Sequence, residues 1–354
     1  MKILVLNSGS SSIKFKLFNG KNFKVLFEGI QEEVEDFHKS FENIFTVLLK
    51  SKIIKKLEDI SIVGHRVVHG GEKFSKPIIV TTKSIKEIEK LIDLAPLHNP
   101  SNIDGIKTIE AKLPNVMQVA VFDTAFHHTI PKRNFLYPIP IAYYDKYKIR
   151  KYGFHGTSVA YVVKKFAKEF NKKLKNLNLI VLHIGNGASV TAIKKGNSFD
   201  TSMGFTPLEG LMMGTRSGDI DPSIVLYLQQ NLNLKVNEIN NLLNKESGFK
   251  GICGKSDLRE ILDDCKSGDE SSKLAVDMYV DRIRKYLVNY ILKLKKVDGI
   301  IFTGGIGENS SIIRDKVCED LSYILKEENK TKIVVIKTDE EKSIAIQTSR
   351  LIKR

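Results

Sequence analysis

Short apolar runs alternate along the chain with stretches whose apolar residues recur at helical spacing. The runs that fit buried strands are Ile3–Leu6, Ile60–Val63, Val116–Phe122, Leu179–Leu182, Gly299–Thr303 and Ile333–Ile336. The longest helical pattern covers Lys273–Lys296, and shorter ones lie at Ile85–Leu91, Val159–Phe170 and Glu340–Arg354. Alternation of this kind is typical of layered proteins, so the sequence predicts an α/β fold.

Three of these apolar runs end in a turn rich in Gly, Ser or Asn. The first run leads through such a turn into Ile13, Phe15 and Leu17, which alternate with lysines as in a half-exposed strand. Leu182–Ala192 repeats this pattern, and Phe302–Asn309 holds a third Gly-rich turn. Backbone N–H groups in such turns can surround an anion. One turn alone fits an ordinary hairpin, but the three together favour a duplicated clamp for nucleotide phosphates.

Length and cysteine content narrow the protein class. A chain of 354 residues is expected to form about two domains. The apolar stretch after Lys2 ends at Asn7, and no run reaches the roughly 18 residues of a membrane span. The three cysteines show no C-x-x-C spacing, which argues against a disulfide framework and a zinc site. We therefore expect a soluble, cytoplasmic protein.

A net charge of +15 raises the possibility of nucleic-acid binding. The lysines are scattered and mostly stand beside Glu or Asp, and no basic block is interleaved with aromatic residues. We therefore expect a solvated basic surface and neither a nucleic-acid nor a membrane partner. A positive field would also attract small anions.

Dense polar clusters follow several apolar runs. They are Gly64–Gly71, Ala95–Pro100, Asp123, Gly153–Ser158 and Gly214–Asp219. Arginine, histidine and aspartate in Gly-flanked positions suit a site for phosphate and carboxylate. Each cluster also has a simpler interpretation. An arginine can form a surface ion pair. His65 and His69 can have a packing role or bind a metal ion, and Asp123 can cap a helix.

The clusters resemble those of the acetate kinase family over nearly the whole chain. The stretches that carry the resemblance are LVLNSGSSSIKF, VGHRVVHGG, PLHNP, FDTAFH, YGFHGTS, HIGNGAS, TPLEGLMMGTRSGDIDP, FTGGIGENS and TDEEKSIA. The resemblance implies two duplicated actin-like, ribonuclease H-like α/β domains that close on ATP, with a nucleotide cleft between them. We place the first domain at 1–124 plus 340–354 and the second at 125–339.

The resemblance also implies roles for individual residues. Those matching catalytic positions are Arg66, Asp123, His155 and Arg216, and those linked to Mg²⁺ are Asn7, Asp123 and Glu340. Those matching the acyl-substrate site are Arg66, Val68, Leu97, His98, Phe154 and Pro207. Those matching the nucleotide site are His183, Ile184, Gly185, Asn186, Gly187, Asp257, Leu258, Arg259, Gly304, Gly305, Ile306, Gly307, Glu308 and Asn309.

The activity implied by the resemblance is reversible, direct in-line phosphoryl transfer from ATP to acetate, giving acetyl phosphate and ADP. Mg²⁺ is the expected metal ion, with Mn²⁺ as an alternative, and the expected assembly is a homodimer. A propionate kinase of the same family is the nearest alternative, and an actin-like or Hsp70-like ATPase without a carboxylate substrate is a distant one. Val159, Asp339 and Gly304 depart from the usual family pattern, and none of them is assigned to catalysis, although Gly304 belongs to the expected nucleotide loop.

Overall fold

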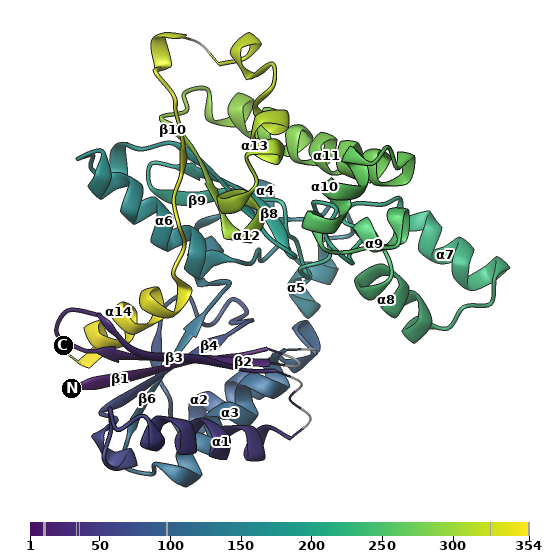
Figure 1. Cartoon of the computed structure of the whole chain (residues 1–354). Helices are drawn as coiled ribbons and strands as arrows, with labels where there is room; N and C mark the ends of the chain where they lie inside the picture. Colours follow the sequence, from purple (N-terminus) through teal and green to yellow (C-terminus); the bar gives the residue numbers. More distant parts are fainter. Residues whose placement is uncertain (10–11, 33, 35, 97, 326, 353–354) are drawn as a thin grey trace. The chain divides into compact units, whose positions relative to one another are not determined.

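The computed structural model describes residues 1–9, 12–32, 34, 36–96, 98–325 and 327–352. It divides into two compact units (Figure 1). Unit 1 comprises Met1–His128, Gly156–Tyr161 and Asp339–Arg354, and unit 2 comprises Thr129–His155 and Val162–Thr338. The predicted boundaries differ from this division at 125–128, 156–161 and 339. The start of the helix at Gly156 belongs with unit 1 because the Gly156 N–H donates to the Asp123 carbonyl at 2.9 Å.

Unit 1 is built on one mixed sheet with the strand order β3-β2-β1-β4-β6-β5. The strands are β1 (Lys2–Ser8), β2 (Ser12–Asn19), β3 (Val25–Glu32), β4 (Ile62–Val67), β5 (Ile78–Ile79) and β6 (Met117–Phe122). The helices are α1 (Phe37–Lys50), α2 (Thr82–Glu89), α3 (Asn99–Lys112) and α14 (Glu340–Ile352), with 3₁₀ turns at Leu57–Asp59, Ile92–Leu94 and Ala125–Thr129.

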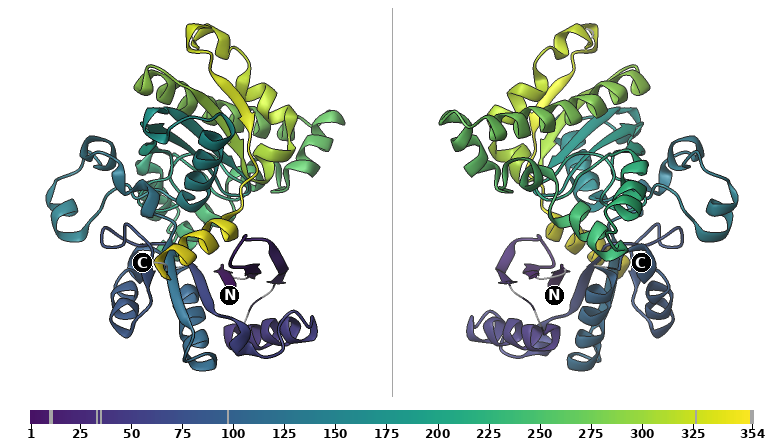
Figure 2. Two further views of the ribbon diagram at one scale, coloured as in Figure 1. Left: turned by 90° about the vertical axis from the view of Figure 1, so that its left-hand side faces the viewer. Right: turned by 90° about the vertical axis from the view of Figure 1, so that its right-hand side faces the viewer.

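The alternation of apolar residues in β1 explains how this sheet is covered on both faces. Leu4 and Leu6 pack with residues of α1, whereas Ile3 and Val5 pack with Ile344 of α14. Successive side chains of a strand point to opposite faces, so a continuous apolar run must be covered twice. Accordingly, α14 lies on one face of the sheet in unit 1 and α1 and α3 on the other (Figure 2).

Unit 2 is built on a second sheet with the strand order β11-β10-β7-β8-β9. The strands are β7 (Leu179–Ile184), β8 (Ala188–Lys194), β9 (Asn197–Thr201), β10 (Gly299–Thr303) and β11 (Lys332–Val335). The helices are α4 (Lys132–Phe135), α5 (Ala142–Tyr147), α7 (Pro222–Asn231), α8 (Val236–Lys245), α9 (Gly248–Cys253), α10 (Leu258–Lys266), α11 (Glu270–Leu294), α12 (Gly304–Asn309) and α13 (Ser311–Cys318). The 3₁₀ turns are Leu174–Asn176, Leu321–Tyr323 and Glu327–Asn329, and α6 (Gly156–Glu169) has residues in both units.

The two sheets share one topology, which confirms the predicted α/β fold with duplicated domains. In unit 1, β1, β2 and β3 form an antiparallel meander, and β4 and β6 follow in parallel beside β1. In unit 2, β7, β8 and β9 form the same meander, and β10 and β11 follow in parallel beside β7. The sequence pattern anticipated both hairpins that begin these meanders.

The third Gly-rich segment differs from its prediction. Residues 304–309 form the short helix α12 and not an open turn. The helix begins at Gly304, whose φ of +80° suits glycine, and Glu308 accepts a hydrogen bond from the Gly304 N–H at 3.1 Å. This side-chain cap stabilises a helical conformation that glycines alone do not favour.

None of the helices in the described residues is both long enough and apolar enough to cross a membrane.

Candidate active site

Three neighbouring parallel strands of unit 1 bring a group of polar residues to one edge of the sheet. Asn7 lies near the end of β1, Arg66 near the end of β4, and Asp123 directly after β6. Parallel strands end on the same side of a sheet, and this is where ligands of α/β proteins usually bind. The first residue of α14, Glu340, joins them, and we call these four residues the unit 1 cluster.

Arg66 is the centre of the unit 1 cluster. Its Nη2 lies 2.9 Å from Asp123 Oδ2, its Nη1 donates to Asn7 Oδ1 at 3.2 Å, and its Nε lies 3.7 Å from Glu340 Oε2. Burial alone would lower the pKa of Arg66, but the two carboxylates outweigh burial and raise it. The guanidinium is therefore permanently charged and already engaged by the protein.

Glu340 is the least stabilised anion of the unit 1 cluster. Burial raises the pKa of Glu340 to about 7, although Arg66 acts in the opposite direction, and Asp123 adds to the rise. The buried carboxylate of Asp123 and the half-buried carboxylate of Glu340 thus share one guanidinium, which leaves an excess of negative charge at the edge of the sheet. Such a site attracts a further cation.

The first turn of α14 places two adjacent glutamates in unit 1. Asp339 caps this helix because its Oδ1 accepts the Lys342 N–H at 3.0 Å. Carboxylates are favoured in the first turn, where the helix dipole is positive. Glu340 faces Arg66, and the neighbouring Glu341 accepts a hydrogen bond from Asn7 Nδ2 at 3.2 Å.

His155 of unit 2 stands in a backbone conformation that is rare for its residue type. Its φ is +59°, and it directly precedes α6. The ring is fixed on two sides, because Nδ1 lies 3.0 Å from Ser189 Oγ and the ring stacks on His183 with centroids 4.1 Å apart. Nonglycine residues in this conformation cluster at functional sites.

Arg216 and His155 meet at the glycine turn between β7 and β8. A Cβ atom added to Gly187 would lie 3.6 Å from His155 Nε2 and 3.7 Å from Arg216 Nη1. The side chains of His155 and Arg216 therefore converge on Gly187, which has no side chain of its own. This arrangement leaves room for an anionic group and supplies donors to bind it.

Arg216 has a very different environment from that of Arg66. Its Nη1 donates to the Pro207 carbonyl at 3.1 Å and contacts Met213 Sδ at 3.7 Å. Among the described residues, no carboxylate lies within ion-pair distance of this guanidinium. Burial lowers the pKa of Arg216, and no neighbouring charge compensates.

A network of polar side chains holds the loop that carries Pro207 and Arg216. The Tyr137 hydroxyl donates to Glu209 and accepts the Phe205 N–H at 2.7 Å. Asp219 accepts the Gly210 N–H at 2.8 Å and the Tyr286 hydroxyl at 2.7 Å. These bonds tie the loop to α11 and fix the position from which Arg216 reaches the glycine turn.

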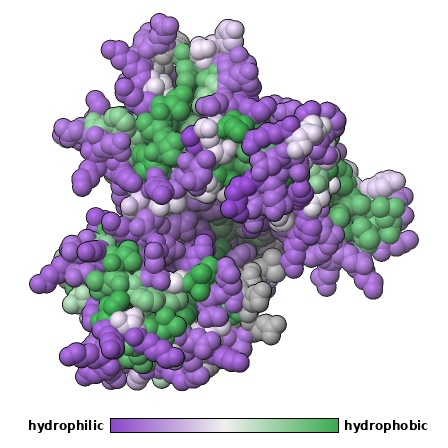
Figure 3. Space-filling view, viewed as in Figure 1, coloured by the Kyte–Doolittle hydropathy of each residue, from purple (hydrophilic) through white to green (hydrophobic). Residues whose placement is uncertain are grey.

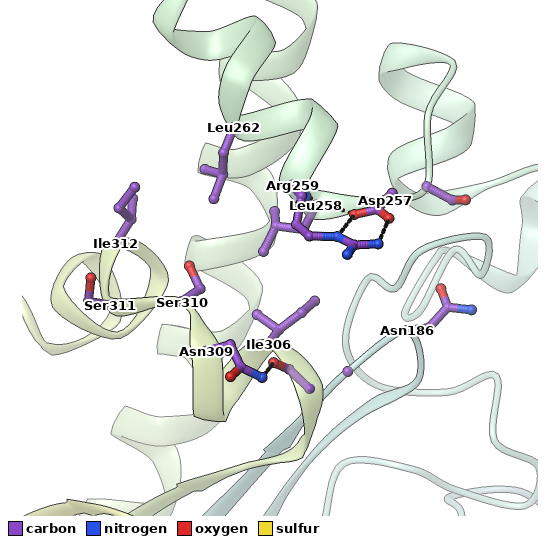
Figure 4. Close-up of a pocket in the computed structure, with 13 residues that line it drawn as sticks. Asn186, Asp257, Leu258, Arg259, Leu262, Ile306, Asn309, Ser310, Ser311 and Ile312 are labelled. Atoms are coloured by element: carbon purple, nitrogen blue, oxygen red, sulfur yellow. Dashed lines mark hydrogen bonds and ion pairs between the residues drawn. The ribbon is translucent and has the colours of Figure 1, made fainter. Parts of the chain in front are cut away.

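A cavity of about 670 Å³ opens in unit 2 beside this turn (Figure 4). Its volume suits a nucleoside-sized ligand. Apolar side chains from α10, α12 and α13 line it, and the Asp257–Arg259 ion pair, with an Nη2 to Oδ2 distance of 2.5 Å, lies among them. Several residues that the sequence predicts to bind nucleotide line this cavity: Gly185, Asn186, Asp257, Leu258, Arg259, Gly305, Ile306 and Asn309.

The other residues predicted for nucleotide binding lie close by without lining this cavity. His183 stacks on His155, Ile184 and Gly307 are buried, and Glu308 accepts the backbone N–H groups of Gly304 and Thr338. Sequence reasoning missed the lining residues Ser256, Leu262, Ser310, Ser311 and Ile312. Leu262 follows Leu258 by one helical turn, a spacing that could have identified it.

The residues predicted for the acyl substrate are distributed over both units. Val68 is buried in unit 1, where its N–H donates to Asn102 Oδ1 at 2.9 Å, and half-buried His98 immediately precedes α3. Phe154 is buried and Pro207 half-buried in unit 2, and Leu97 lies outside the described residues. The apolar substrate pocket therefore stays a prediction.

Comparison with known proteins gives a consistent result across the chain. A sequence model of the acetokinase family matches residues 30–325. An acetate kinase of Sulfurovum sp. is 47% identical over 394 aligned positions that cover all of both chains. Two crystal structures are each 41% identical and cover 99% of both chains: an acetate kinase of Porphyromonas gingivalis, with a TM-score of 0.93, and a propionate kinase of Francisella tularensis, with a TM-score of 0.92.

Proposed function

The chain belongs to the acetokinase family, and we propose that it catalyses the reversible transfer of the terminal phosphoryl group of ATP to acetate. The products are acetyl phosphate and ADP. The observation that carries this proposal is Arg216, a half-buried guanidinium without a carboxylate partner among the described residues, beside His155 and a glycine turn. Such a group is suited to bind an anionic substrate.

We assign the nucleotide to the cavity of unit 2. The apolar side chains of Leu258, Leu262 and Ile306 offer a surface for the adenine ring, and Gly185 and Asn186 come from the turn after β7. In the repeated topology this turn corresponds to the one after β1. Its backbone N–H groups are suited to the phosphates.

The chemistry assigned to the arginines and to His155 follows from the substrates. Acetate is ionised at neutral pH, so its attack on phosphorus needs no strong general base. Two anions must nevertheless approach each other, and Arg216 offsets their repulsion. His155, held by Ser189, donates to an oxygen of the transferring group, whose charge it stabilises. Asp123, already paired with Arg66, serves as a positioning or metal-organising residue.

The unit 1 cluster fits a magnesium ion. Asn7, Asp123 and Glu340 provide the oxygen donors that Mg²⁺ prefers, and Mg²⁺ retains several waters when protein ligands are few. Burial, and after it the nearby Asp123 and Glu341 carboxylates, raise the pKa of Glu340, and a cation bound here would stabilise its charged form. Among the described residues, no group of three or more His, Cys, Asp or Glu side chains forms a complete metal site. When held by Asn7, Asp123 and Glu340, Mg²⁺ would supply positive charge that offsets the negative charge of the phosphate groups.

A propionate kinase is the second candidate function. The specific observation in its favour is the likeness to the Francisella structure, which equals that to the Porphyromonas acetate kinase in sequence identity. Both activities use the same phosphoryl transfer and differ in the space left for one methylene group. Such a group changes selectivity by only about 1–3 kcal/mol.

The decisive experiment traps acyl phosphate with hydroxylamine in reactions that contain ATP, Mg²⁺ and either acetate, propionate or butyrate. We expect the highest kcat/KM with acetate. A preference for propionate would support the second candidate. Folded protein that hydrolyses ATP but forms no acyl phosphate from any of the acids would instead favour an ATPase without a carboxylate substrate.

We also propose that two copies of this chain associate through the surface around α7. None of the residues of this helix is buried, and Ile224, Leu226 and Tyr227 expose large side chains, as do Leu232 and Val236 beyond it. These residues contribute to an apolar area on the surface (Figure 3). An apolar surface of this kind marks a protein–protein contact.

Light scattering after size exclusion tests this association. The unchanged protein is expected to run as a dimer and Leu226→Glu as a monomer. The matched control is Leu292→Glu, because Leu292 is the same residue type and is more exposed than Leu226, at 69% against 54%, but lies on α11. A monomeric unchanged protein, or dissociation by the control alone, would contradict the proposed interface.

A further inference from the structure

The side-chain amide of Asn7 is held at both ends by charged partners. Its Oδ1 accepts from Arg66 Nη1, and its Nδ2 donates to Glu341 Oε1, both at 3.2 Å. A guanidinium can only donate and a carboxylate can only accept. The two partners therefore permit a single orientation of the amide, with its oxygen on the side of the unit 1 cluster.

Lys16 forms an ion pair with Glu341, the residue that accepts the hydrogen bond from the Asn7 amide. Its Nζ lies 3.6 Å from Glu341 Oε2, 3.6 Å from Asp339 Oδ1 and 3.4 Å from Glu28 Oε2. Lys16 pairs with Val5 in the β1–β2 ladder and so lies on the same sheet face as Asn7, two residues further along β1. Only 11% of the Glu341 side chain is exposed, and a buried carboxylate needs such a compensating charge.

Glu340 and Glu341 have different environments although they are adjacent in sequence. Glu340 faces Arg66 at 3.7 Å and has no closer ion pair among the described residues. Each oxygen of Glu341 has a partner within the protein, Oε1 with Asn7 and Oε2 with Lys16. Glu341 is therefore placed to orient Asn7, whereas Glu340 is placed to receive a cation.

We propose that Glu341, anchored by Lys16, is a positioning residue that fixes the orientation of the Asn7 amide. Without this acceptor, the amide keeps only its hydrogen bond from Arg66, and its nitrogen loses its partner, so the amide can rotate away from this orientation. The oxygen of Asn7 is the atom that a metal ion or a substrate donor would use. The inference thus rests on the proposed function for its effect on turnover, but not for the orientation itself.

A double-mutant cycle tests the effect on turnover. We expect Glu341→Ala to lower kcat about tenfold, the scale of one lost charged hydrogen bond, and to have no further effect in an Asn7→Ala background. Glu341→Gln retains an oxygen that can accept from Asn7 and is expected to recover most of kcat. Glu28→Ala removes another carboxylate beside Lys16 without contacting Asn7, so it is expected to change kcat less than twofold. An equal loss from Glu341→Ala in both backgrounds would overturn the proposal.

A second measurement reports the orientation without any activity. In protein labelled with ¹⁵N at asparagine and free of nucleotide, the side-chain NH₂ signals of Asn7, assigned by their loss in Asn7→Ala, report its hydrogen bond. We expect Glu341→Ala to shift these signals and speed their exchange with water, while Glu28→Ala leaves them in place. Unchanged signals in Glu341→Ala would refute the positioning role, even if the enzyme had a different acyl substrate.

Discussion

Arg66 and Arg216 are the same residue type in opposite electrostatic settings. Arg66 of unit 1 contacts two carboxylates and an amide oxygen, which raise its pKa above the value that burial alone would give. Arg216 of unit 2 contacts a carbonyl oxygen and a sulfur atom, and burial lowers its pKa. The first guanidinium is paired with carboxylates of the protein, whereas the second has no carboxylate partner among the described residues.

The different partners of Arg66 and Arg216 indicate different roles for two arginines that the sequence alone does not distinguish. A guanidinium that already binds two carboxylates organises those carboxylates, and its removal takes away the positive charge that compensates them. A guanidinium with no carboxylate partner among the described residues has less to lose structurally and more to gain from an anionic substrate. The predictions below test this contrast.

The largest effect is expected from Arg66→Ala. Loss of the guanidinium leaves Asp123 and Glu340 without their shared partner, and breaking a buried pair in this way costs about 3–5 kcal/mol. Urea unfolding of the variant is expected to show this loss together with a fall in turnover. In the double variant Arg66→Ala/Asp123→Ala, part of the stability is expected to return. If Arg66→Ala were inactive but as stable as the unchanged protein, Arg66 would have no structural role that distinguishes it from Arg216.

Arg216→Ala is expected to act on catalysis and not on stability. Removing one donor to a developing anion lowers kcat by about 10²–10³-fold. Arg216→Lys keeps the charge but not the planar fork, so an intermediate loss is expected. Arg284 provides the control, because Arg284→Ala removes a guanidinium that is paired with Asp320 and assigned to neither substrate nor nucleotide. Acyl phosphate formation at a near-normal rate by Arg216→Ala would show that the site is wrongly assigned.

A third prediction concerns His65, the buried neighbour of Arg66 in β4, and the stability of the protein in acid. Burial lowers the pKa of His65 to about 4 although its ring contacts Gln118 at 2.7 Å. Between pH 6.5 and 4 the unfolded chain takes up a proton that the folded protein does not, so stability falls as the pH falls. We expect His65 to account for about 2 kcal/mol of the loss in unfolding free energy between pH 7 and pH 5. His65→Gln should flatten the profile by this amount, and an unchanged profile would exclude the histidine as its cause.

The smallest effect concerns the cavity of unit 2. A Cβ atom added to Gly305 meets no protein atom within 4 Å, so Gly305→Val is expected to fold with unchanged stability. Its methyl groups would occupy space assigned to the nucleotide and weaken ADP binding about tenfold, or 1.4 kcal/mol. Calorimetric titration with ADP measures this change, and KM for acetate provides the control. Unaltered ADP affinity would place the nucleotide elsewhere.

Most of the fold could be predicted because buried strands leave a strong apolar pattern. The runs that became β1, β6, β7 and β10 were identified from the sequence, as was the long helix α11. Three strands, β3, β5 and β9, were not. β9 has the sequence NSFDT, and β5 contains only Ile78 and Ile79, so neither shows a pattern without its hydrogen-bonded partner. The position of β11 at Lys332–Val335 rather than Ile333–Ile336 reflects where pairing with β10 ends.

Less of the candidate site could be predicted from physical reasoning. The polar clusters marked Arg66, Asp123 and His155, but only the family resemblance distinguished them from surface pairs and helix caps. The pairing of Arg66 with Asp123 depends on strands 57 residues apart and has no local sequence signal. Glu341 was missed for the same reason, because its contact with Asn7 spans 334 residues.

The φ of +59° at His155 limits which single substitutions can be compared there. Alanine at this position removes the ring and also strains the backbone, so its effect would mix two causes. Asparagine, which tolerates this conformation and differs from histidine by one base in the genetic code, removes the ring alone. A substitution at position 155 therefore has to satisfy two separate requirements, the positive φ of the backbone and the chemistry of the ring. Only a residue that tolerates the positive φ shows the effect of losing the ring by itself.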